Sequence, residues 1–209
     1  MDKKRKGGKH QGEALVQAVQ RADIRLGHAA AEWRYHPVVR VLKRARDLAD
    51  QPPLIALSLG TVAAGAVGSD RRLARTGARM LASHLVATAI KAVVKHRVDR
   101  ARPGLFGGER DHQLTRGDRD EGPRNSFPSG HTAGAMAVSR AILREYPGAR
   151  GPAYAAVVAT GAVQLPTGAH FPLDVAAGAA IGLAAEALVA RILPEDACEE
   201  SQVTVPAKL

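Results

Sequence analysis

The stretch NSFPSGHTAG, Asn125–Gly134, changes within a few residues from a polar loop to a run of small residues typical of a helix. Ser129 is a good N-cap after Pro128, so we expect a helix to begin near Gly130. The first turn of a helix offers unpaired backbone N–H groups at the positive end of its dipole, which is a favourable place for an anion. Gly130 leaves the backbone open to such an anion, and His131 stands where it could pass a proton to one of its oxygens. Taken alone, the same residues also fit an ordinary helix cap.

Apolar tracts rich in Ala and Gly lie on both sides of this stretch. They are Pro52–Gly68, Gly77–Lys95, His131–Leu143, Ala153–Leu165 and Pro172–Leu193. Each is long enough for a helix, and we find neither an internal repeat nor a convincing run of strands. The fold class is therefore predicted to be all-α, a helical bundle of about five helices preceded by an N-terminal amphipathic helix.

The bundle could lie in a membrane or in water. The mean hydropathy of −0.14 is low, and charged residues within the tracts are typical of a soluble core: Arg79, Lys91, Arg140 and Glu186. However, the basic tail at 1–12 and the polar loop at 96–128 lower the mean hydropathy. Ala- and Gly-rich helices also pack closely in lipid through their small faces. We predict a multi-pass protein of the cell membrane and keep the soluble bundle as an alternative. The tract Pro52–Gly68 fits either a short span or a buried helix.

The 209 residues are enough for one sizeable domain. We divide them into a basic disordered tail at 1–12, an amphipathic or interfacial helical segment at 13–51, a phosphate-site helical bundle at 52–194 and a C-terminal tail at 195–209. The basic start is followed by an amphipathic segment and not by an uninterrupted apolar core, so we expect it to be retained. Cys198 is the only cysteine, which excludes an intrachain disulfide.

The net charge of +10 and a pI near 10.3 are consistent with a surface that faces phosphate groups. Charge alone does not choose among lipid headgroups, nucleic acid and a phosphorylated substrate. A basic run at the N-terminus is also often only a solvated tail. Because the chain combines this charge with apolar tracts, we expect a membrane surface as its partner and no nucleic acid.

Two further clusters could complete an anion site. Lys95 and Arg102 flank the junction KHRVDRARPG, where an apolar tract gives way to the polar loop. His170 and Asp174 stand four residues apart across a helix start at Pro172, a spacing that can bring a carboxylate to one ring nitrogen and leave the other as a neutral nucleophile or base. Taken alone, Lys95 and Arg102 are better explained as ordinary surface charge, and the pair His170 and Asp174 is equally well explained by a structural hydrogen bond. Together the three clusters predict one anion site with two imidazoles.

In order along the chain, these clusters resemble the three-part signature of the type-2 phosphatidic acid phosphatase superfamily. The first part is Lys95 followed, after six residues, by Arg102-Pro103. The second is the tetrad PSGH at 128–131, and the third is His170 followed, after three residues, by Asp174. The superfamily also includes bacterial acid phosphatases and vanadium haloperoxidases. The resemblance covers about 52–193 and implies a helical bundle with its site at one end, with no metal and no other cofactor.

The resemblance also implies a role for each matching residue. His170 would attack phosphorus and form a phosphohistidine, Asp174 would orient it, and His131 would protonate the leaving oxygen and later activate water. The phosphoryl oxygens would be held by Lys95, Arg102, Ser129 and Gly130. The implied substrate is a lipid phosphate or an isoprenoid diphosphate at a bilayer surface.

Gln164 departs from this signature, since the third motif opens with Ser-Arg where this chain has Val163-Gln164. A glutamine in the phosphate-binding set can donate a hydrogen bond but brings neither a charge nor a bidentate fork. An arginine of the polar loop, such as Arg124, is a candidate replacement. A weakened or silent family member that binds lipid phosphate or a protein partner is therefore one alternative, and a soluble acid phosphatase or haloperoxidase is another. The substrate lipid, the membrane face and the oligomeric state stay open.

Overall fold

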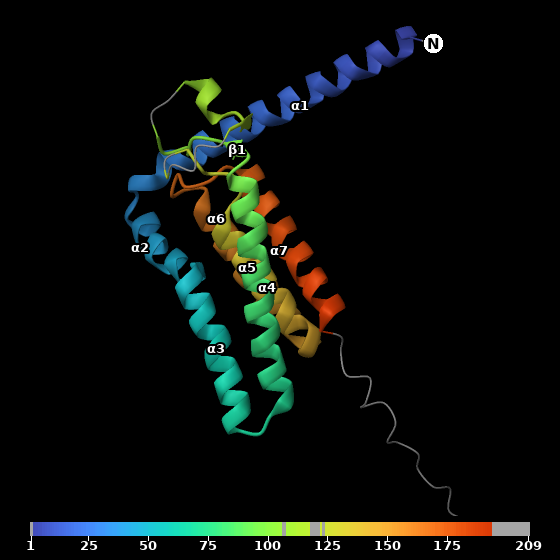
Figure 1. The fold of residues 1–209 in the computed structure, drawn as a ribbon. Coiled ribbons are helices and arrows are strands. Elements are labelled where there is room, and N and C mark those ends of the chain that lie inside the picture. Colours follow the sequence, from blue (N-terminus) through green and yellow to red (C-terminus); the bar gives the residue numbers. More distant parts are fainter. Residues whose placement is uncertain (1, 106–107, 118–121, 123, 194–209) are drawn as a thin grey trace, which may run out of the picture.

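The computed structural model describes residues 2–105, 108–117, 122 and 124–193, without the side chains of 2–10, 45 and 109. Within these residues the chain forms an elongated all-α bundle (Figure 1). The α-helices are α1 Asp2–Ala31, α2 Pro37–Arg46, α3 Gln51–Val67, α4 Arg71–Lys95, α5 Gly130–Glu145, α6 Arg150–Gln164 and α7 Pro172–Ile192. The predicted fold class is confirmed, and α3 to α7 match the five predicted tracts to within a few residues at most ends.

Short elements complete the described chain. Four 3-10 turns cover Glu32–Tyr35, Asp47–Ala49, Glu109–His112 and Pro147–Ala149. The polar loop between α4 and α5 contains a small antiparallel pair that the sequence did not lead us to expect, β1 at Val98–Asp99 and β2 at Thr115–Arg116. Two residues per strand are too few to carry an alternating pattern, so this pair left no signal in the sequence.

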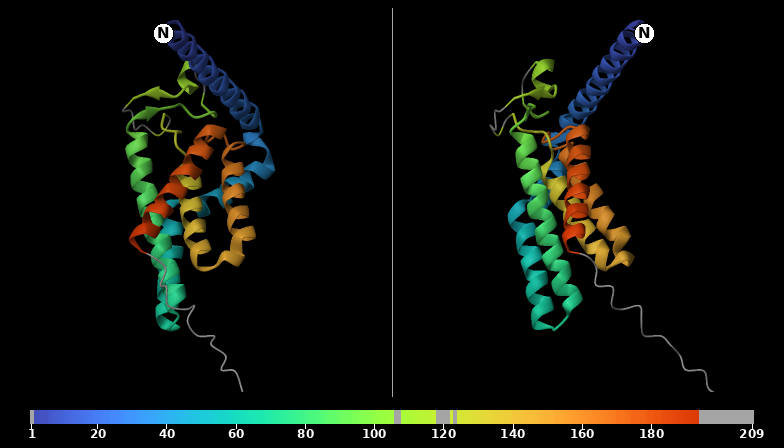
Figure 2. Two further views of the ribbon diagram at one scale, coloured as in Figure 1. Left: turned by 90° about the vertical axis from the view of Figure 1, so that its right-hand side faces the viewer. Right: turned by 45° about the vertical axis from the view of Figure 1, so that its right-hand side comes forward.

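Helices α4, α5 and α7 form the centre of the bundle, with α3 packed on α4 and α6 on α5 (Figure 2). The backbones of α5 and α7 come close together at Gly178 and Gly182. A Cβ atom on Gly182 would lie 2.5 Å from the carbonyl oxygen of Ala133, and one on Gly178 would lie even closer to that of Ser129. Small residues permit this approach, which holds the start of α7 beside the start of α5.

The outer surface of the bundle carries many large apolar side chains. Within the described residues, α4 and α7 are long and apolar enough to cross a membrane, and α3 is a shorter apolar helix. Large apolar side chains are exposed on α3, α4, α6 and α7, among them Leu57, Leu85, Val158 and Leu188. Soluble monomers rarely expose large apolar patches, so exposed apolar side chains on four helices are consistent with an apolar environment around the bundle.

Arg79 and Glu186, two of the charged residues inside the tracts, are paired. Arg79 is 2% exposed and its Nε lies 3.2 Å from Oε1 of Glu145, whose other oxygen pairs with Arg75 at 2.8 Å. Glu186 pairs with Arg144 at 2.7 Å. Since buried charges are tolerated when they are paired, these residues do not argue against an apolar environment for the bundle.

Helix α1 begins at Asp2, inside the segment 1–12 for which the composition predicts disorder. Lys, Arg and Gln are good helix formers and no proline interrupts this segment, which is compatible with a continuous helix. The C-terminal tail predicted at 195–209, with Cys198, lies outside the described residues.

Helices α3 and α4 form a hairpin that leads away from α1 and returns to it (Figure 1). As a result α1, the polar loop and the starts of α5 and α7 gather at one end of the bundle, while the turn between α3 and α4 and the end of α7 lie at the other. We call the first of these the loop end. It carries every residue of the three sequence clusters.

Candidate active site

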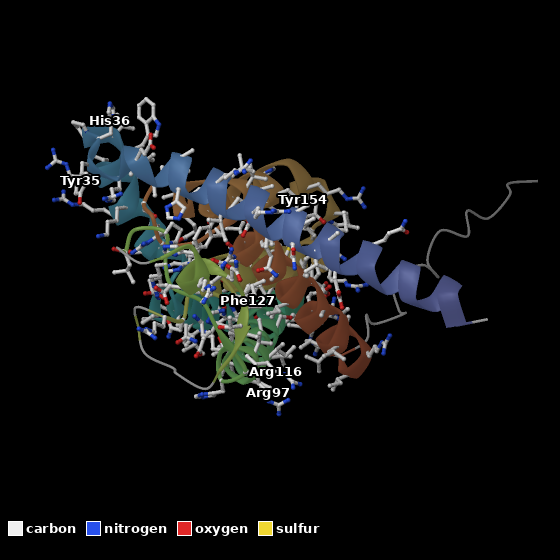
Figure 3. All side chains as sticks on the ribbon, turned by 90° about the horizontal axis from the view of Figure 1, so that it is seen from above. Tyr35, His36, Arg97, Arg116, Phe127 and Tyr154 are labelled. Carbon is white, nitrogen blue, oxygen red and sulfur yellow. The ribbon has the colours of Figure 1, made fainter. Side chains whose placement is uncertain are left out.

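The start of α5 lies where the sequence predicts it. Ser129 is the N-cap, and its hydroxyl accepts from the backbone N–H of Thr132 at 3.5 Å and lies 3.0 Å from the Thr132 hydroxyl. The backbone N–H of Ser129 donates to the carbonyl oxygen of Asp174 at 3.0 Å, which ties α5 to the first turn of α7. In a view onto the loop end, α1 crosses over the bundle, with Phe127 near the middle and Arg97 and Arg116 at the rim (Figure 3).

His170 and Asp174 face each other. His170 is buried in the loop between α6 and α7, and its Nδ1 lies 3.7 Å from Oδ2 of Asp174. That distance is an ion-pair distance and too long for a hydrogen bond. Asp174 is held elsewhere, because Oδ2 accepts the Phe171 N–H at 2.8 Å and Oδ1 accepts from Arg100 at 2.6 Å. The carboxylate therefore stands in front of the imidazole with its position set by other partners.

The surroundings of His170 favour its neutral form. Burial lowers the pKa of the imidazole, the carboxylate of Asp174 opposes this effect, and the cations Arg102 and Lys95 lower the pKa further. A neutral imidazole is the form that can act as a nucleophile, and the two cations that disfavour its protonation are also the groups that would attract an anionic substrate.

His131 lies on the first turn of α5 and is partly exposed, with 17% of its side chain accessible. Its Nε2 is 3.8 Å from Oδ1 of Asp50, the N-cap of α3. The two imidazoles of the site are close enough to interact electrostatically. Asp50 is a site neighbour that sequence reasoning missed, since it lies far along the chain from all three motifs.

The predicted cations approach the site from the end of α4 and from the polar loop. Lys95 ends α4, and its ammonium group contacts the carbonyl oxygen of Asn125. Arg102 donates to the carbonyl oxygen of Gly122 at 3.0 Å and lies 3.4 Å from Oδ1 of Asn125. Burial lowers the pKa of Arg102, Arg46 acts in the same direction, and Asp174 opposes both. Arg46 of α2 is thus a further cation near the site, and nothing in its local sequence separates it from the other basic residues of the segment 13–51.

Gln164 is fully buried at the end of α6. Its carbonyl oxygen accepts the N–H of Ala169 at 3.2 Å, which places it beside the His170 loop. Neither Oε1 nor Nε2 of its side chain has a hydrogen-bond partner among the described residues. Arg124, the candidate replacement from the polar loop, is exposed and engages the fold through its carbonyl oxygen, which accepts the N–H of Arg100.

Arg100 contacts Asp174 directly, although the sequence did not single it out. It is completely buried and bonded to Asp174, but it stands among seven arginines of the loop at 96–128 with no local feature to distinguish it. No cluster of three or more His, Cys, Asp or Glu side chains that could hold a metal ion occurs within residues 2–105, 108–117, 122 and 124–193.

The crystal structure of Aquifex aeolicus LpxE is similar in fold, with a TM-score of 0.58 and 18% identity over 80% of this chain and 93% of that one. The crystal structure of a transmembrane PAP2-type phosphatidylglycerolphosphate phosphatase from Bacillus subtilis is also similar in fold. Its TM-score is 0.60, with 22% identity over 84% of this chain and 86% of that one. No curated protein sequence matches. The model of the PAP2 superfamily matches residues 76–197, which is more than half of the chain and includes all three motifs, and the chain therefore belongs to the PAP2 superfamily.

Proposed function

We propose that this protein is a membrane phosphatase that hydrolyses a lipid phosphomonoester or diphosphate through a phosphohistidine intermediate and without a metal ion. The proposal rests on three groups that lie together at the loop end. They are the buried imidazole of His170, the carboxylate of Asp174 that faces it, and the imidazole of His131 at the start of α5. Two cations approach the same place. This set suits the transfer of a phosphoryl group, because it pairs a neutral nucleophile with groups that hold negative charge.

In the first step the free N–H groups at the start of α5, together with Lys95 and Arg102, bind the phosphoryl oxygens. The free ring nitrogen of His170 attacks phosphorus, the bond to the leaving oxygen breaks, and His131 donates its proton to that oxygen. Asp174 holds the imidazole of His170 in line and stabilises the positive charge that it acquires.

In the second step a water molecule attacks the phosphohistidine. His131, now neutral, takes one proton from this water as the P–N bond breaks, and inorganic phosphate leaves. His170 returns to its neutral form, and His131 regains the proton that it needs for the next cycle. Atoms, protons and electrons therefore balance over the two reaction steps.

The membrane location is supported by the large apolar side chains exposed on the bundle and by the length of α4 and α7. The similar Bacillus subtilis structure is described as a transmembrane phosphatidylglycerolphosphate phosphatase, which favours a lipid phosphomonoester as the substrate class here. An isoprenoid diphosphate is the second candidate. Because the site shares the loop end with the basic N-terminal segment, the excess of positive charge on cytoplasmic segments favours a cytoplasmic site in the cell membrane.

The test is phosphate release by the purified protein in detergent from a short-chain phosphatidate and from an isoprenoid diphosphate, with and without a chelator. We expect release that the chelator leaves unchanged, and acid-labile protein-bound phosphate after a rapid quench. His170→Asn should lose both signals, whereas His36→Asn, a change at an exposed histidine outside the site, should keep them. Phosphate release by His170→Asn at the parental rate would disprove the nucleophile. Loss of release by the parental protein on addition of the chelator would disprove the metal-independent mechanism.

A second candidate function is favoured by Gln164, whose buried amide stands where the family has an arginine. A site that lacks one cation could retain lipid phosphate without turning it over. This function predicts binding of the protein to phosphatidate-containing vesicles together with no release of phosphate from either substrate.

A further inference from the structure

Helix α1 reaches the catalytic pair through a chain of buried ion pairs. Asp23 of α1 is 4% exposed, and its Oδ2 pairs with one terminal nitrogen of Arg100. The other terminal nitrogen of Arg100 donates to Oδ1 of Asp174 at 2.6 Å, and its Nε donates to the carbonyl oxygen of His112 at 2.8 Å. Every side of this buried guanidinium is thus engaged, and one of its carboxylate partners comes from α1.

The same carboxylate also binds α7 directly. Oδ1 of Asp23 accepts the backbone N–H of Leu173 at 2.7 Å. Leu173 lies in the first turn of α7, next to Asp174, where backbone N–H groups have no partner within the helix and a negative charge is favourable. Asp23 therefore fixes both the backbone beside Asp174 and the arginine that holds its side chain.

The contact between α1 and the site is tightly packed. A Cβ atom on Gly27 would lie 2.7 Å from Cε1 of Phe171 and closer still to Cδ1, so only glycine fits at this position of α1. The ring of Phe171 is completely buried, and the guanidinium of Arg100 stacks over it at 3.9 Å from the ring centre. Phe171 directly follows His170, so α1 packs against the segment that carries the nucleophile.

We propose that Asp23 is a positioning residue for the His170–Asp174 pair, which makes α1 a part of the catalytic apparatus; the proposal rests on the proposed function of that pair. The side chains of His170 and Asp174 are 3.7 Å apart, too far for a hydrogen bond between them. Their separation is therefore set by the other partners of Asp174. Without Asp23, Arg100 is a buried cation with one carboxylate instead of two. It then draws the Asp174 carboxylate toward itself and away from the imidazole.

The main experiment compares Asp23→Asn with Glu32→Gln, a matched loss of a carboxylate at an exposed position nearby. For Asp23→Asn we expect kcat on short-chain phosphatidate to fall by about 10- to 100-fold, the cost of a small misplacement of a reacting group, with KM changed by less than about 3-fold. The control should keep both constants. In an Asp174→Asn background, Asp23→Asn should lower the rate by less than about 2-fold, because the residue through which it acts is already altered.

A role in general stability alone predicts a different result. The factor lost on Asp23→Asn would then be the same in both backgrounds, or would appear in the amount of folded protein and not in kcat, and either result would overturn the proposal. In case Asp23→Asn fails to fold, the double variant Asp23→Asn with Arg100→Met removes the uncompensated buried charge. It should fold and show the same fall in kcat, and a parental kcat in this variant would also overturn the proposal.

Hydrogen exchange tests the connection without any catalysis. Asp23→Asn should increase deuterium uptake in the peptide around 171–175 within the folded protein, while Glu32→Gln leaves it unchanged. If the parental protein releases no phosphate, the proposed function fails while this measurement still tests the coupling of α1 to α7. Unchanged uptake in Asp23→Asn would overturn the inference and leave the proposed function intact.

Discussion

Replacing Gln164 with methionine tests what the buried amide does. Its side chain is completely buried and both polar atoms lack a partner among the described residues. A protein keeps such a group when the group binds a ligand, and otherwise the unpaired amide only lowers stability. Methionine has nearly the same length and volume as glutamine but no hydrogen-bonding groups to satisfy, so Gln164→Met isolates the amide.

The expected magnitude follows from the missing hydrogen bonds. An unsatisfied buried polar group costs about 1–3 kcal/mol, so Gln164→Met should stabilise the folded protein by about that amount. For a chain of this size, each kcal/mol corresponds to a rise in Tm of about 2–4 °C. If the amide donates to a phosphoryl oxygen, its loss should slow phosphate release by about 2- to 10-fold, the value of one neutral hydrogen bond.

The assay is thermal unfolding of the protein in detergent together with steady-state phosphate release. Gln51→Met is the matched control, because the Gln51 amide is hydrogen-bonded to the Thr88 hydroxyl at 3.0 Å and its loss should lower Tm. A lower Tm for Gln164→Met would refute the reasoning, since it would mean that the amide is satisfied in the folded protein. An unchanged rate would mean that Gln164 does not face the phosphate.

Other consequences of the site can be checked in the same preparation. Gln164→Arg should raise turnover by about 10- to 1000-fold if the missing cation limits the rate, and a fall in turnover would point to a site packed for an amide. His131→Asn should slow release severely, but least with an aryl phosphate whose leaving group needs no proton, and equal losses on both substrates would argue against its role as the acid. Because burial lowers the pKa of His170, the neutral nucleophile should persist in acid. The apparent pKa of the acid limb of kcat/KM should therefore lie below the ordinary imidazole value of about 6.5. An apparent pKa at or above that value would contradict the assignment. In a chain without its native cysteine, an impermeant thiol reagent should label Val67→Cys in intact cells and leave Arg116→Cys unlabelled, and the reverse pattern would put the site on the outer face.

The helices and their order could be predicted from the sequence because the signals are local. Each apolar tract is long enough to show its own pattern, and the cap at Ser129 depends on residues within one turn of it. The family motifs are also local, so His131, His170 and Asp174 could be picked out before the fold was known. Their meeting at one end then follows from helices that run back and forth with short connections.

The tertiary structure alone decided which other residues complete the site. Asp23 lies 150 residues before Leu173 and 77 before Arg100, and the pairing of a carboxylate with a distant guanidinium leaves no pattern in either segment. Arg100 looks like its neighbours in the polar loop until burial removes it from water. Gln164 and His170 were named from their motifs, but only the structure shows that the amide of Gln164 is buried without a partner among the described residues and that burial lowers the pKa of His170. Burial and the partners of a charged group depend on all the helices packed around it, and that information is spread over the whole chain.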